Sequence, residues 1–366
     1  MKKIKLIIFH PYSRIGGADL SISRLINNLD SNKYSISLIT FKNPEINFYL
    51  KKKIKIKILK SSRTILSIFE IRKIVKQEKR DKYLKIIFIS NQNFANIISV
   101  LALTKINWIK LILIERNNPI ELDFSKKLKD KLIKILIKFT YKYADKIISI
   151  SKELSHDLKK ICKKNVTTIY NAPIDFNKNI SIDKKNKKKK LHNYKIILNV
   201  ARFEKQKNHF MLLESFKQIH NSIDVKLILI GYGSEEGSII KFIKKNKLEK
   251  KILIIKNPKN IFEYYKIANL FVLTSIYEGF GNVLIEAGIF KLPIISTNCK
   301  SGPKEILNNG KFGDLVNIDD VETLSKLIIK NLKYPNKKKI SKMYKSLKRF
   351  SIKKHILSYE KIFKQV

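Results

Sequence analysis

The segment LFVLTSIYEGFGNVLIEA (residues 270–287) holds the pattern that decides the fold. It opens with the apolar run LFVLT, which is typical of a short buried strand. Gly279 and Gly281 then permit an unusual turn with exposed backbone. Asn282 can cap the helix that follows. A strand, a glycine turn and a helix in this order predict one β/α unit of a parallel sheet.

Similar apolar runs alternate with helical patterns in both halves of the chain. We therefore expect an α/β protein with two Rossmann-like domains that face a central cleft. Ligands of such sheets collect beyond the carboxyl ends of the strands, so the chemistry is expected there. The predicted strands are 4–9, 35–41, 84–90, 109–114 and 146–151, then 195–201, 225–231, 251–256, 270–274 and 292–297.

The polar, basic segment NKNISIDKKNKKKKLHN (177–193) interrupts this alternation and is predicted to be a linker or an exposed loop. We place the first domain at residues 1–178 and the second at 190–349. The tail from about residue 337 has a helical pattern. Its last part, about 350–366, is expected to pack back on the first domain.

The 366 residues include 77 Lys and Arg against 30 Asp and Glu, a net charge of +47. Such a charge favours anionic membranes, phosphorylated ligands or nucleic acid. A compositional bias toward Lys, Ile and Asn along the whole chain is an alternative explanation of this net charge. No nucleic-acid recognition module is recognisable, so nucleic acid is not expected as a partner.

Two cysteines, Cys162 and Cys299, stand far apart, which excludes a disulfide framework and zinc-ligand spacing. No apolar run is long enough for a transmembrane helix, and the amino terminus resembles a first strand more than a signal peptide. We expect a cytoplasmic protein.

The opening segment carries two carboxylates, Glu278 in the loop and Glu286 about one turn into the helix. Eight positions apart, they can reach different hydroxyls of one elongated, sugar-bearing ligand. The helix start after Gly281 favours an anion through its free N–H groups and its dipole. The same spacing also fits an ordinary helix with a glycine-rich start and a surface glutamate.

The segment NVARFEKQKNH (199–209) places Arg202 and Lys207 in one loop after a strand. A forked guanidinium and a mobile ammonium together suit a diphosphate. In so lysine-rich a chain, Lys207 alone also fits an ordinary surface lysine.

The segment HPYSRIGGADLSISRLI (10–26) has Gly16 and Gly17 between a strand and a helix, where backbone N–H groups can approach a phosphate. It is neither GxGxxG nor a Walker A loop, which disfavours nicotinamide dinucleotides and ATP hydrolysis. Gly231-Tyr232-Gly233 is interpreted as a tight turn.

Together these segments resemble the retaining, nucleotide-sugar-dependent glycosyltransferases of family 4, which have the two-Rossmann GT-B architecture. The similarity extends over nearly the whole chain, and the spacing of Glu278 and Glu286 is its most specific mark. The nearest subgroup builds capsule, O-antigen or lipid-linked oligosaccharides. The matching segments are IGGADLSISRLINNL (15–29), LIERNNP (113–119), YKYADKIISISKELSHDL (141–158), TIYNAPID (168–175), NVARFEKQKNH and EGFGNVLIEA.

The resemblance implies a role for each matching residue. Arg202 and Lys207 would bind the donor diphosphate and, with Glu278, form the catalytic set. A larger group of residues would bind the donor. Within it, Glu286 would bind the ribose, and the others would approach the phosphates or the sugar hydroxyls. That group is Gly16, Gly17, Gly279, Phe280, Gly281, Asn282 and Glu286.

One departure concerns the first domain, where many relatives carry a histidine near the sugar. Here that place reads Glu115-Arg116-Asn117, so we assign no catalytic histidine. The chain contains no Asp-x-Asp sequence, and we expect neither a metal nor a cofactor. The donor is expected to be a UDP-hexose or a UDP-N-acetylhexosamine, and retention at the anomeric carbon is implied.

Residues 124–143 have the pattern of a basic amphipathic helix. Such a helix can lie in an anionic membrane interface, near a lipid-linked or glycan acceptor on the inner face of the plasma membrane. It also fits a domain helix whose apolar face lies in the core. Two other functions stay open: a nucleotide-sugar epimerase or glycogen-phosphorylase-like enzyme of the same architecture, and a non-catalytic basic binding protein.

Overall fold

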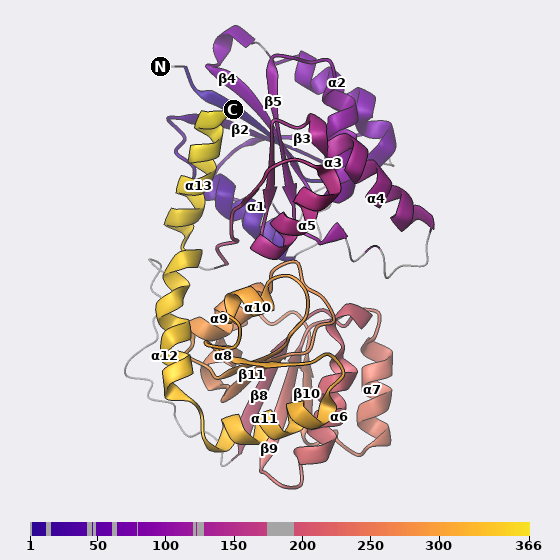
Figure 1. Ribbon diagram of the computed structural model, residues 1–366, viewed down its shortest axis with the longest axis vertical. Helices are drawn as coiled ribbons and strands as arrows, with labels where there is room; N and C mark the ends of the chain where they lie inside the picture. The colour runs from indigo at the N-terminus through magenta and orange to yellow at the C-terminus, as the bar shows by residue number, and fades with distance from the viewer. Residues whose placement is uncertain are drawn as a thin grey trace. The chain divides into compact units, whose positions relative to one another are not determined.

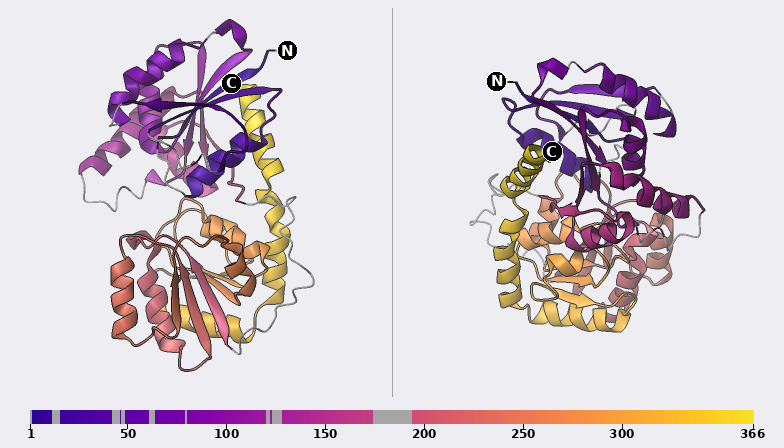
Figure 2. Two further views of the ribbon diagram at one scale, coloured as in Figure 1. Left: turned by 180° about the vertical axis from the view of Figure 1, so that it is seen from behind. Right: turned by 45° about the horizontal axis from the view of Figure 1, so that its top comes forward.

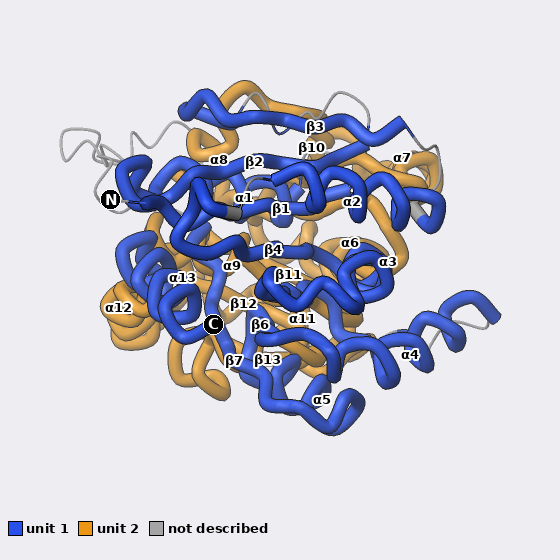
Figure 3. Tube along the Cα trace, turned by 90° about the horizontal axis from the view of Figure 1, so that it is seen from above, with its two compact units in different colours: residues 1–175, 350–366 blue, residues 176–349 orange. Residues whose placement is uncertain are grey.

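The computed structural model describes residues 2–11, 16–41, 46, 49–60, 64–78, 80–119, 122, 128–173 and 194–366. The chain divides into two compact units, residues 1–175 with 350–366 and residues 176–349 (Figure 3). Each unit contains one all-parallel sheet with flanking helices, which confirms the predicted pair of Rossmann-like domains. The predicted linker at 177–193 lies outside the described residues.

The first unit contains a seven-stranded sheet in the order β3-β2-β1-β4-β5-β6-β7, which can be followed in Figure 3. Isoleucine, leucine and phenylalanine dominate its central strands, as expected for strands that are buried on both faces. Its strands are β1 (Ile4–Phe9), β2 (Tyr34–Phe41), β3 (Lys55–Leu59), β4 (Lys85–Asn91), β5 (Ile109–Glu115), β6 (Lys146–Ser149) and β7 (Val166–Thr168).

The second unit contains a six-stranded sheet in the order β10-β9-β8-β11-β12-β13. β8 lies between β9 and β11, and Lys195 is aligned with Val225 in the register of β8 and β9. The strands are β8 (Lys195–Val200), β9 (Val225–Ile230), β10 (Ile252–Ile255), β11 (Leu270–Leu273), β12 (Ile294–Thr297) and β13 (Asp314–Val316).

Helices connect most successive strands, as is usual in parallel sheets, and three more follow the last strand. In the first unit they are α1 (Gly17–Asn28), α2 (Ser67–Lys76), α3 (Asn93–Leu103), α4 (Leu128–Thr140), α5 (Lys152–Cys162) and α13 (Ile352–Gln365). In the second unit they are α6 (His209–Ile219), α7 (Glu236–Lys245), α8 (Phe262–Ile267), α9 (Asn282–Ile289), α10 (Pro303–Ile306), α11 (Val321–Lys333) and α12 (Lys337–Ser346).

The last helix, α13, packs on the first unit beside α1 (Figures 1 and 2). The ring of Phe363 lies 5.7 Å from that of Tyr34, edge to face. Lys85 Nζ donates to the carbonyl oxygens of Phe363 and Val366 at 3.0 and 2.7 Å. Tyr359, Ile362 and Phe363 join the buried cluster formed by one face of the sheet and α1.

All the predicted strands are present, and three more were not predicted. β3 (KIKIL) alternates lysine with isoleucine because it is a half-exposed edge strand. β7 and β13 have three residues each and also form sheet edges. Within the described residues, no helix combines the length and apolar character needed to cross a bilayer.

Candidate functional site

Three loops that follow neighbouring strands of the second sheet make up the candidate site. β8 leads into the loop of Arg202 and Lys207, β11 into the loop of Glu278, and β12 into residues 298–302. These strands are parallel, so their carboxyl ends meet at one edge of the sheet (Figure 1). The topology therefore brings together residues that are distant in sequence.

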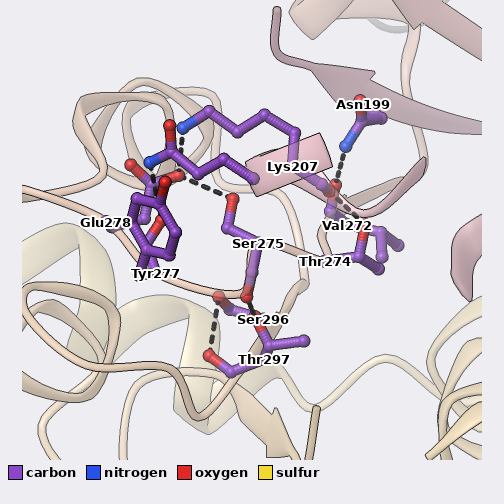
Figure 4. Close-up of polar contacts among 10 residues, drawn as sticks. Asn199, Lys207, Val272, Thr274, Ser275, Tyr277, Glu278, Ser296 and Thr297 are labelled. Atoms are coloured by element: carbon purple, nitrogen blue, oxygen red, sulfur yellow. Dashed lines mark hydrogen bonds and ion pairs between the residues drawn. The ribbon is translucent and has the colours of Figure 1, made fainter. Parts of the chain in front are cut away.

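Lys207 and Glu278 form an ion pair at the centre of this edge (Figure 4). Lys207 Nζ lies 2.6 Å from Glu278 Oε1, and the hydroxyl of Ser275 donates to the same oxygen at 2.7 Å. Only 13% of the Lys207 side chain and 9% of the Glu278 side chain are exposed. A buried carboxylate needs such compensation, so the pair holds both groups in place.

Further hydrogen bonds fix the loop that carries Glu278. Gln206 Nε2 donates to the carbonyl oxygen of Tyr277 at 2.8 Å. The backbone N–H of Ile276 donates to the carbonyl oxygen of Gln206, also at 2.8 Å. Thr274 donates its hydroxyl to the carbonyl oxygen of Lys207 at 3.1 Å. Figure 4 shows Ser275 between Lys207 and Thr297, with Thr274 beside the backbone of Lys207. The loops after β8 and β11 are thus preorganised as one body.

Arg202 is exposed, but its backbone is held closely by the turn after β9. The N–H of Phe203 donates to the carbonyl oxygen of Tyr232 at 2.9 Å. A Cβ atom at Gly231 would lie 1.9 Å from the carbonyl oxygen of Ala201, and one at Gly233 2.4 Å from that of Phe203. Only glycine permits this approach, so the turn 231–233 supports the Arg202 loop, a role that the sequence did not suggest.

The residues Gly279, Phe280, Gly281 and Asn282 lead from the Glu278 loop into α9. Phe280 is 2% exposed and anchors the turn, and Gly281 has a φ of 96°, in the left-handed region that favours glycine. α9 begins at Asn282. The N–H of Leu284 donates to the carbonyl oxygen of Gly281 at 3.0 Å. The positive end of the helix dipole at this start suits an anionic ligand.

Glu286 lies about one turn into α9 and is half-buried. The hydroxyl of Tyr265, on α8, donates to Glu286 Oε2 at 2.9 Å. Burial, and then the charge of Glu286, raise the pKa of Tyr265 well above its ordinary value of 10. The sequence analysis missed this contact of Tyr265 with a candidate site residue, since nothing in the spacing links positions 265 and 286.

Gly16 and Gly17 belong to the first unit, at the start of α1, where Gly16 has an extended backbone and precedes the first helical turn. The structure groups the other predicted site residues in the second unit. Among the described residues no group of three or more His, Cys, Asp or Glu side chains gathers.

A second buried polar cluster, also missed by the sequence analysis, lies at the carboxyl ends of β1, β4 and β5 in the first unit. His10 Nε2 lies 2.9 Å from Asp19 Oδ1, and Asn91 Nδ2 lies 2.8 Å from His10 Nδ1. Arg116 donates to Asn91 Oδ1 at 2.5 Å and to Asn171 Oδ1 at 3.0 Å. All five side chains are almost fully buried, which explains why each has a partner.

The neighbouring carboxyl group of Glu115 is completely buried. Burial raises the pKa of Glu115 from 4.5 to about 7, against the opposing effect of the hydroxyl of Tyr141, which donates to Glu115 Oε2 at 2.5 Å. Glu115 and Arg116 are therefore internal polar residues of the first unit.

Residues 181–350 match the sequence model of the family Glycosyl transferases group 1. A glycosyltransferase of Methanocaldococcus jannaschii is 34% identical over 252 residues, 65% of this chain and 61% of the relative. The amylovoran biosynthesis glycosyltransferase AmsD of Erwinia amylovora is 29% identical over 315 residues, 84% of each chain.

A third relative is the N-acetylgalactosamine-N,N'-diacetylbacillosaminyl-diphospho-undecaprenol 4-alpha-N-acetylgalactosaminyltransferase of Campylobacter jejuni, 30% identical over 235 residues and 63% of each chain. The chain thus spans less than two thirds of the length of two of these relatives.

Among solved structures, HepE of Anabaena in complex with UDP superposes with a TM-score of 0.80 at 15% identity, over 100% of both chains. This likeness shows the fold. The domain of residues 181–350 thus resembles the group 1 glycosyltransferases, and the two parallel sheets of the chain are those of the GT-B fold.

Proposed function

We propose that this protein is a retaining glycosyltransferase that moves a sugar from a nucleotide-sugar to a lipid-linked or polysaccharide acceptor in surface-glycan biosynthesis. The family and the names of the relatives support this proposal. The Anabaena structure with UDP supports a UDP-sugar donor. The name of the C. jejuni relative, which contains diphospho-undecaprenol, supports a lipid-linked acceptor.

The observation that carries the proposal is the cluster of Lys207, Glu278 and Ser275 at the carboxyl edge of the second sheet. Lys207 has three N–H donors and gives one to Glu278, so two remain for a diphosphate. Glu278 Oε1 accepts from Lys207 and Ser275, which leaves Oε2 to accept from a sugar hydroxyl. The cluster can therefore bind both ends of a bond between sugar and diphosphate.

In this proposal, catalysis comes from stabilising the leaving group. When the bond between the sugar and the diphosphate breaks, negative charge grows on the diphosphate. Arg202 and Lys207, fixed on adjoining parts of one loop, together with the start of α9, neutralise that charge without a metal. Glu286, oriented by Tyr265, holds the ribose.

The decisive measurement is the transfer of radiolabelled sugar from UDP-, GDP- and ADP-sugars to an acceptor in membrane extracts. We expect transfer from one UDP-sugar. Arg202→Ala and Glu286→Ala should each reduce it by about ten- to a hundredfold, since a charge-assisted hydrogen bond contributes ~1.5–3 kcal/mol. Lys205→Ala, an exposed lysine of the same loop, is the matched control and should transfer normally.

Near-normal rates of sugar transfer in both Arg202→Ala and Glu286→Ala would contradict the assignment of this site. Conversion of the donor without an acceptor would indicate the alternative of an epimerase, and binding without turnover would indicate a non-catalytic protein. The anomeric configuration of the product, measured by NMR, tests whether transfer retains the configuration of the donor. An inverted product would contradict the proposed retaining mechanism.

We further propose that α4 contacts an anionic membrane surface. The helix buries Ile133 and Ile137 in the first unit and leaves a separate apolar stripe in solvent. Leu128, Leu132 and Phe139 on this stripe are 84%, 55% and 56% exposed. Apolar and basic groups side by side suit the interface of an anionic bilayer.

A groove of about 530 Å³ between α4 and α5 supports the same idea. Its lining combines two isoleucines with five lysines, namely Ile135, Ile161, Lys131, Lys134, Lys138, Lys160 and Lys163. Because lysine stems cover apolar surface while their ammonium groups reach phosphates, such a lining suits phospholipid head groups.

Flotation with anionic and neutral liposomes tests this contact. We expect the protein to float only with anionic liposomes and Leu132→Ser/Phe139→Ser to lose most of this binding. Tyr334→Ser/Leu357→Ser, at exposed apolar positions of other elements, is the control and should float normally. Equal binding to both kinds of liposome, or equal loss in both variants, would contradict the role of α4.

A further inference from the structure

The first unit contains a strongly basic basin. It lies at the edge of the sheet opposite to the buried polar cluster of His10 and Arg116. The basin has a volume of about 1050 Å³ and is lined by residues at or just before the amino ends of β1, β2, β3 and β4. Substrates of α/β sheets bind beyond the carboxyl ends of the strands. This basin is therefore a separate place on the protein.

The lining contains seven lysines and a single carboxylate, Glu78. The lysines are Lys2, Lys3, Lys5, Lys52, Lys53, Lys55 and Lys82. Glu78 cannot balance them, because its two oxygens already face Lys5 at 4.0 Å and Lys57 at 3.3 Å. The basin thus carries a large uncompensated positive charge.

Several of these lysines are held in position by the chain itself. Lys3 Nζ donates to the carbonyl oxygen of Ser31 at 2.9 Å, and Lys52 Nζ donates to that of Leu29. Lys5 is 4% exposed, and its ammonium group lies 5.5 Å from the centre of the ring of Tyr83. A buried ammonium whose nearest carboxylate is 4.0 Å away and shared with another lysine is costly unless an anion offsets its charge.

We propose that this basin binds an oligophosphate, a compact anion with several linked phosphate groups. Lysine ammonium groups are mobile point charges without the fork of arginine, so they suit a flexible chain of phosphates better than one planar anion. Several ammonium groups around one cavity also favour several charges on one ligand. The site is independent of the proposed transfer reaction and its donor.

The test is calorimetric titration of the full chain with inorganic tripolyphosphate, with orthophosphate as the comparison. We expect tripolyphosphate to bind at one site, with an affinity that falls as salt rises, and orthophosphate to bind far more weakly. Lys53→Gln/Lys82→Gln removes two exposed ammonium groups of the lining and should weaken binding roughly tenfold, as expected for two partly exposed ion pairs.

Lys241→Gln/Lys244→Gln, on exposed positions of α7, changes the net charge equally and should alter the affinity less than about twofold. Equal weakening by both double variants, or no binding of tripolyphosphate, would overturn the proposal. Displacement of tripolyphosphate by UDP would place it in the donor site instead. Equally tight binding of single-stranded DNA or of anionic vesicles through the same lysines would show an unselective surface, which also overturns it.

Discussion

The hydroxyl of Tyr265 donates a hydrogen bond of 2.9 Å to Glu286 Oε2 and so connects α8 to α9. Tyr265 is fully buried, and its ring stacks on Phe290 and Phe271 at 5.5 and 5.7 Å. Because burial and the carboxylate raise the pKa of Tyr265 well above 10, the hydroxyl stays protonated and remains a donor. A rigid aromatic stack therefore fixes one oxygen of the glutamate that we propose for ribose binding.

We predict that Tyr265→Phe weakens donor binding and leaves the chemical step nearly unchanged. Loss of one hydrogen bond to a charged group costs ~1.5–3 kcal/mol, so the KM for the donor should rise at least about tenfold. Steady-state kinetics with the UDP-sugar that the transfer assay selects measures this. Tyr264→Phe, at the neighbouring half-exposed position, is the control. A fall in kcat with an unchanged KM would contradict the positioning role.

The contact between Tyr265 and Glu286 also shows where sequence reasoning reached its limit. The grouping of Glu278, Arg202 and Lys207 at one edge was predictable, because each follows a strand whose apolar run is unmistakable and the carboxyl ends of parallel strands share an edge. Tyr265 was not predictable, because the partner of a side chain depends on how helices stack over the sheet. No spacing in the sequence encodes that packing.

The ion pair of Lys207 and Glu278 leads to a second prediction, about stability. Lys207→Met should lower the free energy of unfolding by about 3–5 kcal/mol, since it leaves a buried carboxylate without its cation. Lys207→Met/Glu278→Gln should recover most of that loss, because both charges are gone. Urea denaturation of the wild type, both single variants and the double variant gives the coupling energy.

Transfer should fail in all three of these variants, because the proposed diphosphate and hydroxyl contacts are missing in each. Recovery of stability without recovery of activity would separate the structural role of the pair from its catalytic role. A double variant as unstable as Lys207→Met would show that the loss does not come from the unpaired charge of Glu278.

A third prediction concerns Gly302, whose φ is 97° and which packs against the turn before α9. A Cβ atom there would lie 1.8 Å from the carbonyl oxygen of Phe280. Gly302→Ala should therefore destabilise the protein by at least about 1–3 kcal/mol through backbone strain alone, and should displace the Gly279–Gly281 turn. Thermal denaturation and donor binding measure the two effects.

Gly237 is the matched control for this substitution. It lies in the first turn of α7, and a Cβ atom there would meet nothing within 4 Å. Because alanine is the better helix former, Gly237→Ala should leave donor binding intact and raise stability by up to ~1 kcal/mol. Similar losses in both variants would contradict the close packing at Gly302.

The strands that escaped sequence analysis have a common physical cause. β1 and β11 are predictable because both of their faces are buried, so their residues form nearly continuous apolar runs. β3 lies at the edge of its sheet and alternates lysine with isoleucine, and both Lys55 and Ile58 are exposed. In a chain with 77 Lys and Arg, such a pattern does not stand out from the loops.

The last prediction concerns His209, the first residue of α6, which is 2% exposed and has no hydrogen bond to either ring nitrogen. Burial, and then the charge of Lys207, lower the pKa of His209 from 6.5 to about 4. Below pH 6.5, His209 is therefore protonated in the unfolded chain, whereas in the folded chain it becomes protonated only near pH 4. Stability is complete above pH 6.5 and falls as the pH decreases from 6.5 to 4.

His209→Leu removes this titration, and we expect it to reduce the loss of stability between pH 7 and pH 5 by about 2 kcal/mol. The pKa of His355 is also lowered to about 4 by burial, so part of the pH dependence should remain in the variant. Urea denaturation at both pH values measures the difference, and His156→Leu, at an exposed position of α5, is the control. If His209→Leu loses as much stability as the wild type, the imidazole is not buried in its neutral form, and the packing of His209 against Phe203 at 4.9 Å would have to be rejected.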